Sequence, residues 1–229
     1  MTNTTITAAE MAQYIDHTLL KPDATLDALT KLSAEAVSYG FKAVCVNSGH
    51  VAYIAGKLEG TAVAVCTVVG FPLGAMQTRA KAFEAENAVA EGAAELDMVL
   101  NIGALKSGDL KTVEVDIEAV RQVAQNPIIL KVIIETGLLT AEEKIKACEI
   151  TKNAGADFVK TSTGFSGGGA TVEDVALMRE TVGQKMGVKA SGGIKDWSTA
   201  VAMIKAGANR IGTSSGIVIV ENAPESIGS

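Results

Sequence analysis

The sequence predicts an α/β protein folded as one single-domain (β/α)8 (TIM) barrel, with a short helix before the first strand. The chain has 229 residues, close to the length of about 250 that is typical of this fold. Short apolar runs typical of buried strands alternate with longer amphipathic stretches typical of helices. Eight such runs occur, and strands joined by helices form a parallel sheet with right-handed crossovers. We therefore expect residues 1–229 to form one closed barrel.

Most of the predicted strands follow a stop signal for a preceding helix. Glycine accepts the left-handed conformation that ends a helix, and six glycines have this place: Gly40, Gly60, Gly92, Gly155, Gly187 and Gly207. Asn126-Pro127 acts in the same way before another strand. The expected strands are 14–20, 41–47, 62–69, 94–100, 128–135, 156–161, 187–191 and 209–213. The expected helices include 77–91, 110–125, 141–153, 172–184 and 198–206.

An open doubly wound sheet is the alternative arrangement for alternating strands and helices. Such a sheet often carries a Gly-x-Gly-x-x-Gly motif after its first strand, and this chain has none there. No low-complexity linker divides the chain, and the polar segment 221–229 is expected to be a loose tail. The closed barrel is therefore the preferred prediction.

Charge and composition exclude several classes of protein. The formal net charge is −6, and an acidic chain repels phosphate backbones, so we expect no nucleic-acid partner. The three widely spaced cysteines lack a Cys-x-x-Cys motif, which argues against disulfides and a zinc cluster and fits a reducing compartment. No signal peptide is visible, and the longest apolar stretch, 62–75, is too short to span a bilayer. We expect a cytoplasmic protein without membrane association.

Charged residues stand in strands that should be apolar. Side chains of a strand alternate between its two faces, and this places Asp97, Lys160 and Lys189 inside the barrel. A buried lysine is costly, so a structural ion pair with Asp97 is one interpretation. Two lysines near the ends of adjacent strands favour catalysis instead. Two close cations lower each other's pKa, which would make an amine available to attack a carbonyl group.

The other lysines receive structural interpretations. Lys131 shares a strand face with Glu135 but lies deeper, and we interpret it as half of a buried ion pair with a carboxylate. Lys21, Lys42 and Lys81 have the spacing of solvent-exposed lysines.

Small residues end the last two strands. Ser191-Gly192-Gly193 follows the seventh strand, and Gly212 to Gly216 follows the eighth. Loops at these two places commonly bind phosphate in barrel enzymes, through exposed backbone N–H groups. The loop after the sixth strand, from Thr163 to Gly169, is also suited to an anion. Turns require glycine in any case, so these loops favour a phosphate site without proving one.

The histidine content argues against a metal enzyme. Only His17 and His50 are present, and a zinc-dependent aldolase needs several imidazole ligands. We interpret His17 as a structural side chain, and we expect no metal and no cofactor.

At this point the motifs resemble those of the deoxyribose-phosphate aldolase family, which is metal-independent. The matching segments span nearly the whole chain: YIDHTLLKPDAT (14–25), VVGFPLGA (68–75), ELDMVLNIGAL (95–105), LKVIIETGLL (130–139), AGADFVKTSTGF (154–165), VKASGGIK (188–195) and RIGTSSG (210–216). The resemblance implies reversible cleavage of 2-deoxy-D-ribose 5-phosphate to acetaldehyde and D-glyceraldehyde 3-phosphate, in deoxyribonucleoside catabolism. Small sugar phosphates and aldehydes would be its partners, and a homodimer is expected.

The resemblance also implies roles for individual residues. Lys160 matches the Schiff-base lysine, Lys189 the second lysine that tunes it, and Asp97 the proton-relay carboxylate. The remaining matches would line the pocket (Asp16, Thr18, Cys45, Thr163 and Gly164) or bind the phosphate (Gly192, Gly193, Ser214 and Ser215).

One departure from the family concerns the C-terminus. Some members end in a tyrosine that folds toward the site, whereas the sequence ends ESIGS, so we do not expect a tail tyrosine to act in proton transfer here. Two other hypotheses stay open from sequence: another phosphate-binding barrel enzyme such as an isomerase, in which Lys160 is only an electrostatic clamp, and a non-catalytic barrel that binds a sugar phosphate. Borohydride reduction with acetaldehyde separates them from an aldolase, because it traps only an imine.

Overall fold

The computed structural model describes residues 6–224 and is a closed barrel of eight parallel strands. The strands β1 to β8 are Ile15–Leu19, Ala43–Val46, Ala64–Val69, Glu95–Val99, Ile129–Ile133, Phe158–Lys160, Gly187–Ser191 and Arg210–Thr213. They lie in sequence order, and β8 pairs with β1. This closure confirms the predicted (β/α)8 barrel and excludes the open sheet.

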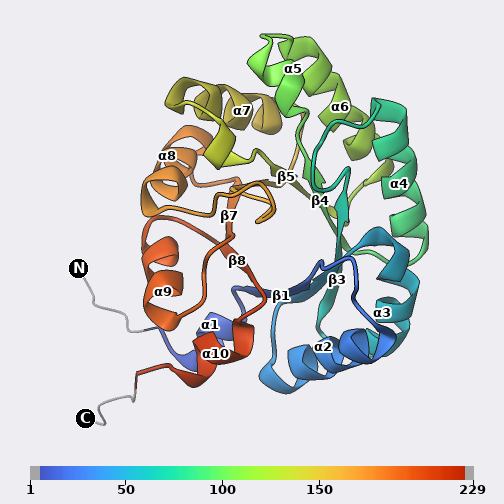
Figure 1. Cartoon of the computed structure of the whole chain (residues 1–229), viewed down its shortest axis with the longest axis vertical. Coiled ribbons are helices and arrows are strands. Elements are labelled where there is room, and N and C mark those ends of the chain that lie inside the picture. The colour runs from blue at the N-terminus through green and yellow to red at the C-terminus, as the bar shows by residue number, and fades with distance from the viewer. Residues whose placement is uncertain (1–5, 225–229) are drawn as a thin grey trace.

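Helices form a ring outside the strands (Figure 1). They are α1 (Ala8–Ala12), α2 (Leu26–Tyr39), α3 (Val51–Leu58), α4 (Thr78–Ala90), α5 (Ile102–Lys106), α6 (Leu110–Val123), α7 (Ala141–Asn153), α8 (Val172–Val182), α9 (Trp197–Lys205) and α10 (Gly216–Glu221), with 3₁₀ turns η1 (Ser48–His50) and η2 (Thr136–Leu138). The short α1 is the expected N-terminal helix, and it packs against α10. Residues 225–229 of the predicted tail lie outside the described residues.

Local signals set most helix boundaries. Thr140 caps the N-terminus of α7 with its hydroxyl, and Glu143 returns a bond to the Thr140 N–H. Gly40 ends α2 in the left-handed conformation, as expected. Gly187 was predicted to end a helix, and that prediction was wrong: Gly183 ends α8, and Gly187 begins β7, where a Cβ would overlap the ring of Phe158.

Lys81 corrects another prediction. It was expected in solvent but is fully buried, and from α4 it donates to the Val99 carbonyl oxygen at 2.8 Å and to Asp116 of α6 at 2.5 Å. Its partner lies 35 residues along the chain, so spacing within the helix could not reveal the pair.

The main apolar core lies between the sheet and the helix ring. A second, small apolar cluster comes from β2, β3 and the end of β1 (Leu20, Ala43, Cys45, Cys66 and Val68). The remaining strands fill the barrel interior with charged side chains. Within the described residues, no helix has the length and apolar character of a membrane span.

Candidate active site

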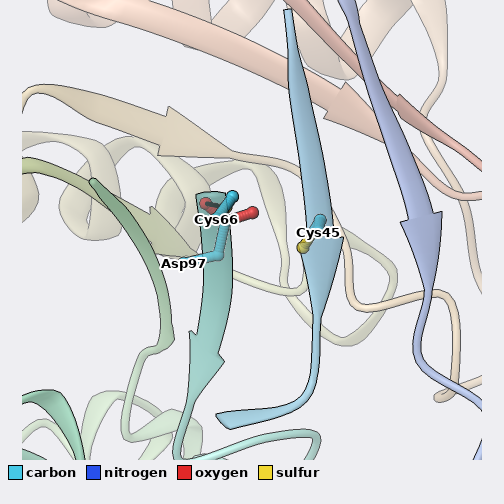
Figure 2. Close-up of side chains that lie close together, drawn as sticks. All are labelled: Cys45, Cys66 and Asp97. Carbon is cyan, nitrogen blue, oxygen red and sulfur yellow. Dashed lines mark hydrogen bonds between the residues drawn. The ribbon is translucent and has the colours of Figure 1, made fainter. Parts of the chain in front are cut away.

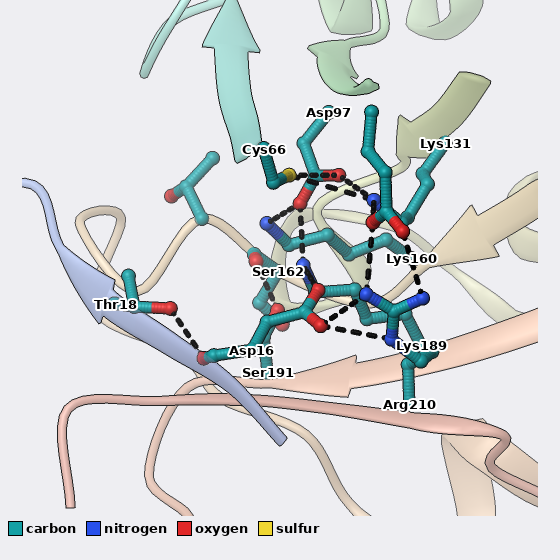
Figure 3. A network of polar contacts seen from close by, with 12 residues as sticks. Asp16, Thr18, Cys66, Asp97, Lys131, Lys160, Ser162, Lys189, Ser191 and Arg210 are labelled. Atoms are coloured by element: carbon teal, nitrogen blue, oxygen red, sulfur yellow. Dashed lines mark hydrogen bonds and ion pairs between the residues drawn. The ribbon is translucent and has the colours of Figure 1, made fainter. Parts of the chain in front are cut away.

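The barrel interior holds one continuous network of charged side chains (Figure 3). Asp97 of β4 lies at its centre and is fully buried. Its Oδ2 atom accepts hydrogen bonds from Lys160 Nζ at 2.6 Å and Lys189 Nζ at 2.7 Å. Its Oδ1 atom accepts one from Lys131 Nζ at 2.8 Å. Asp97 therefore contacts three lysines at once.

A second carboxylate, that of Asp16, also contacts Lys189. Asp16 of β1 accepts from Lys189 through Oδ2 and from Arg210 Nε at 2.8 Å through Oδ1. Arg210 of β8 also donates to Glu95, which binds Lys131 at 2.6 Å. Each of Lys131, Lys189 and Arg210 thus contacts two carboxylates, whereas Lys160 contacts one.

The charges of this network do not cancel. Four cationic side chains (Lys131, Lys160, Lys189 and Arg210) share three carboxylates (Asp16, Glu95 and Asp97). In a medium of low dielectric constant an uncompensated charge is costly. With all seven groups ionised, the network carries one surplus positive charge.

The pKa directions agree with a network of tight ion pairs. Burial would raise the pKa of Asp16, but the cations of Lys189 and Arg210 lower it to about 2. Burial likewise opposes the ionisation of Asp97, yet Lys131, Lys160 and Lys189 hold its pKa well below the usual range. Burial alone would lower the pKa of Lys189, but Asp16 and Asp97 raise it. The sequence-based expectation that Lys189 has a lowered pKa was therefore wrong, because the two carboxylates outweigh burial and the neighbouring Lys131.

An open cavity lies above the network at the C-terminal ends of the strands. Its volume is about 350 Å³, and Lys160 is the one lysine among the Asp97 partners that lines it. Eight predicted site residues line this cavity: Thr18, Lys160, Thr163, Gly164, Gly192, Gly193, Ser214 and Ser215. The other four, Asp16, Cys45, Asp97 and Lys189, are fully buried and do not line it.

The predicted phosphate loops meet at one side of the cavity. Gly192 and Gly193 have positive φ angles of 88° and 79°, which turn the chain after β7. Thr213 joins the two loops, since its hydroxyl donates to the Ile194 carbonyl oxygen at 2.7 Å and accepts from the Ser215 N–H at 2.9 Å. Two exposed lysines, Lys21 and Lys195, complete the wall. They supply local positive charge in an acidic protein.

A group of possible metal ligands lies at the edge of the network (Figure 2). Cys45, Cys66 and Asp97 place one ligand atom each within 4.8 Å of one another. Burial raises the pKa of the Cys66 thiol well above its usual value, whereas metals bind the thiolate. The Cys66 thiol donates to Asp97 at 3.3 Å, and both Asp97 oxygens already accept from lysines. These donors fit a hydrogen-bonded cluster better than a metal site.

Comparison with known proteins identifies the family of this chain. The family model for DeoC/LacD family aldolases matches residues 10–221. The chain belongs to the DeoC/LacD aldolase family. A deoxyribose-phosphate aldolase of Brevibacillus brevis is 63% identical, over 93% of this chain and 96% of that protein. One from a Geobacillus species is 62% identical, over 92% and 95%.

Solved structures of this aldolase family have the same fold. A structure from Coccidioides immitis superposes with a TM-score of 0.91 at 46% identity, covering 93% of this chain and 85% of that one. The tetrameric deoxyribose phosphate aldolase of Aeropyrum pernix gives 0.88 at 34% identity, covering 94% and 91%.

Several site residues of this DeoC/LacD family aldolase were missed from sequence. Glu95 and Arg210 were not singled out, although both are charged residues within predicted strands, and that signal could have found them. Lys131 forms the expected buried ion pair, but with Glu95 and Asp97 rather than with Glu135 on its own strand face. Lys21 is exposed as predicted, yet it lines the cavity.

Proposed function

We propose that this DeoC/LacD family aldolase is a class I enzyme that reversibly cleaves 2-deoxy-D-ribose 5-phosphate to acetaldehyde and D-glyceraldehyde 3-phosphate. The observation that carries the proposal is the position of Lys160, whose amine reaches the cavity from a network with one surplus positive charge. Relatives named deoxyribose-phosphate aldolase, at 62–63% identity, support the substrate.

In this proposal Lys160 forms the covalent intermediate. Its uncharged amine attacks the aldehyde carbon of the open-chain sugar and, after loss of water, forms an imine. Removal of the proton from the C3 hydroxyl then breaks the bond between C2 and C3. C3 leaves as the aldehyde of D-glyceraldehyde 3-phosphate, and the electron pair of the broken bond passes to the protonated imine, which becomes an enamine. Protonation and hydrolysis then release acetaldehyde and free the lysine. Reaction through this imine requires no metal and no cofactor.

Asp97 and Lys189 supply the proton transfers. Asp97 Oδ2 accepts a hydrogen bond from the Lys160 nitrogen, and Lys189 donates to the same oxygen (Figure 3). General acid–base catalysis requires groups within this distance of the reacting nitrogen. Asp16 holds Lys189 in place and keeps it charged. Cys45 packs against Cys66 in the small apolar cluster. Asp16 and Cys45 do not line the cavity in this structure, so a contact of either with the sugar is a prediction from the resemblance alone.

The phosphate would bind where the loops after β7 and β8 meet. Backbone N–H groups near Gly192 and Gly193, the hydroxyls of Ser214 and Ser215, and the nearby ammonium groups suit a dianion. Thr18, Thr163 and Gly164 would contact the sugar between the phosphate and the imine. Binding at both ends would fix the reacting carbons relative to Lys160.

Two further proposals concern the cell and the assembly. A cytoplasmic location is supported by three buried, unpaired cysteines, which are usual in reducing compartments. The expected homodimer stays a prediction, and the Aeropyrum pernix relative is a tetramer.

Product analysis tests the function directly. The purified protein is incubated with 2-deoxy-D-ribose 5-phosphate after prolonged treatment with a chelator, and acetaldehyde and D-glyceraldehyde 3-phosphate are measured. Equal amounts of both products, unchanged by the chelator, are expected. Absence of acetaldehyde, or activity that only a divalent ion restores, would contradict the proposal.

A further inference from the structure

Glu135, directly after β5, has an unusual backbone. Its φ angle is 54°, and it is the one non-glycine residue with positive φ in the described part of the chain. A side chain with a Cβ atom is strained in this left-handed region, and such strain persists only where surrounding contacts hold it. The contacts of Glu135 therefore show which part of the structure depends on this conformation.

The Glu135 carboxylate holds the start of the loop after β6. It is 1% exposed, and within residues 6–224 it pairs with no lysine, arginine or histidine. Instead, both oxygens accept from the Thr163 N–H at 3.3 Å, and Oε2 also accepts from the Thr163 hydroxyl. That hydroxyl accepts in turn from the Phe165 N–H at 3.0 Å. One buried carboxylate thus organises the turn from Thr163 to Phe165.

This turn is a wall of the active-site cavity. Thr163, Gly164 and Phe165 all line the cavity and follow Lys160 by three to five residues. Phe165 also packs edge-on against Phe71 of the β3–α4 loop, with ring centroids 5.2 Å apart. The position of the wall relative to Lys160 therefore depends on Glu135.

The same arrangement reaches the phosphate loops. Gly137, two residues after Glu135, packs against Gly168 so closely that a Cβ would lie 3.4 Å from its Cα. Farther along that loop, the Ala170 N–H donates to the Gly192 carbonyl oxygen at 3.0 Å. The loop after β5 thus contacts the loop after β6, which in turn contacts the loop after β7 at Gly192.

We propose that Glu135 is a positioning residue, which holds the wall of Thr163 to Phe165 at the distance from Lys160 that the phosphorylated sugar requires. The proposal rests on the proposed function, because it assigns the wall to that substrate. Glu135 does not line the cavity and does not contact Asp97, Lys160 or Lys189. It should therefore affect turnover of the sugar phosphate without affecting attack by Lys160 on a small aldehyde.

Two substitutions at Glu135 separate positioning from stability. Glu135→Gln keeps the side-chain shape but removes the negative charge and replaces one of the two acceptor oxygens with an NH2 donor. Glu135→Gly removes the carboxylate and also relieves the backbone strain, so its melting temperature should stay near the wild-type value or rise. Glu142→Gln, on the exposed first turn of α7, is the matched control and should behave as wild type.

The measurement is kcat/KM for 2-deoxy-D-ribose 5-phosphate. It is divided by the fraction of protein molecules that form a borohydride-reduced adduct with acetaldehyde, because this fraction counts the sites with a reactive Lys160. Misplacement by about 1 Å costs about a hundredfold, so we expect a loss of about 10- to 100-fold in both Glu135 variants with trapping near the wild-type yield. Thr163→Val removes the two hydrogen bonds of the hydroxyl, to Glu135 and from the Phe165 N–H, but keeps the bond from the Thr163 N–H to Glu135. It should give a smaller loss of the same kind. This variant tests the proposal even where a Glu135 variant folds poorly.

Three results would overturn the proposal. Unchanged kcat/KM per trapped site with a lower melting temperature would make Glu135 a purely structural residue. If a Glu135 variant lost both acetaldehyde trapping and turnover, Glu135 would act on Lys160 itself and not on the cavity wall. A wild-type protein that traps no acetaldehyde would overturn the proposed function, and with it this inference.

Discussion

Lys160 and Lys189 lie opposite each other on β6 and β7, and their Nζ atoms donate to the same carboxylate oxygen, at 2.6 and 2.7 Å. Two amines on one oxygen allow a proton to pass between them with little movement. The two lysines differ in access, because Lys160 lines the cavity and Lys189 is fully buried. This difference in access supports the proposal that Lys160 has the covalent role and Lys189 the proton-transfer role.

The first prediction concerns Lys189→Leu. The Asp16 and Asp97 carboxylates raise the pKa of Lys189, which favours its ammonium form in the resting protein, and this charge disfavours a second charge nearby. Its removal should move the pH dependence of imine formation with acetaldehyde to higher pH. Turnover at neutral pH should fall by about 10²- to 10⁴-fold, because a proton-transfer group is lost. A pH profile that moves to lower pH would contradict this role.

The second prediction tests the phosphate site. Ser214→Asp and Ser215→Asp place a negative charge in the lining of the cavity where we propose that the phosphate binds. Like-charge contact costs several kcal/mol, so kcat/KM for deoxyribose 5-phosphate should fall at least about a hundredfold. The loss for unphosphorylated deoxyribose should be much smaller.

Ser38→Asp, on the exposed surface of α2, is the control for added charge and should leave both rates unchanged. Equal losses on the two substrates in the Ser214 and Ser215 variants would place the phosphate elsewhere.

A third prediction concerns stability away from the site. Lys81→Met leaves Asp116 buried without its cation, and breaking such a pair costs about 3–5 kcal/mol of unfolding free energy. Adding Asp116→Leu removes the uncompensated charge and should restore much of the loss. Urea unfolding at neutral pH measures both changes. Equal stability of wild type and Lys81→Met would contradict the buried pair.

The fourth prediction is a loss of stability in acid. The folded-state pKa of Asp16 is about 2, below its unfolded value of about 4. Ionised Asp16 therefore stabilises the fold fully above about pH 4, and this contribution, of about 2–3 kcal/mol, is lost as the pH falls from about 4 to 2. Asp97, whose pKa is also lowered, acts in the same direction.

Urea unfolding across this pH range measures the effect. Asp16→Asn should be less stable at pH 7 and should lose less stability between pH 4 and 2 than the wild type does. Asp23→Asn, at an exposed position, should follow the wild-type curve. An identical acid slope for Asp16→Asn and wild type would contradict the assignment.

Much of the fold could be predicted because its signals are local. A cap such as Thr140 or a left-handed glycine such as Gly40 acts within a few residues, and strand alternation placed Asp97, Lys160 and Lys189 inside the barrel. The pairings could not be predicted in the same way. Arg210 meets Asp16 across 194 residues of sequence, and Lys81 meets Asp116 across 35, so only closure of the barrel and packing of the helices reveal them.

Glu135 shows a further limit of strand alternation. Glu135 lies four residues after Lys131, so strand alternation places both side chains on the same face. The backbone turns to positive φ at Glu135, after β5 has ended, and the carboxylate accepts from Thr163 instead. Alternation holds only while the chain stays extended. Residues that follow the end of a strand, as Glu135 follows β5, are therefore less predictable than residues within the strands.

The identity of the nucleophile is the central claim, and the reduced acetaldehyde adduct tests it most directly. The wild-type protein is treated with acetaldehyde and borohydride, digested, and analysed by mass spectrometry, with Lys160→Leu as the control. We predict a single ethyl group on the peptide that contains Lys160, and no adduct at any pH in Lys160→Leu. An adduct on Lys189 in the wild type, or one that persists in Lys160→Leu, would contradict the account.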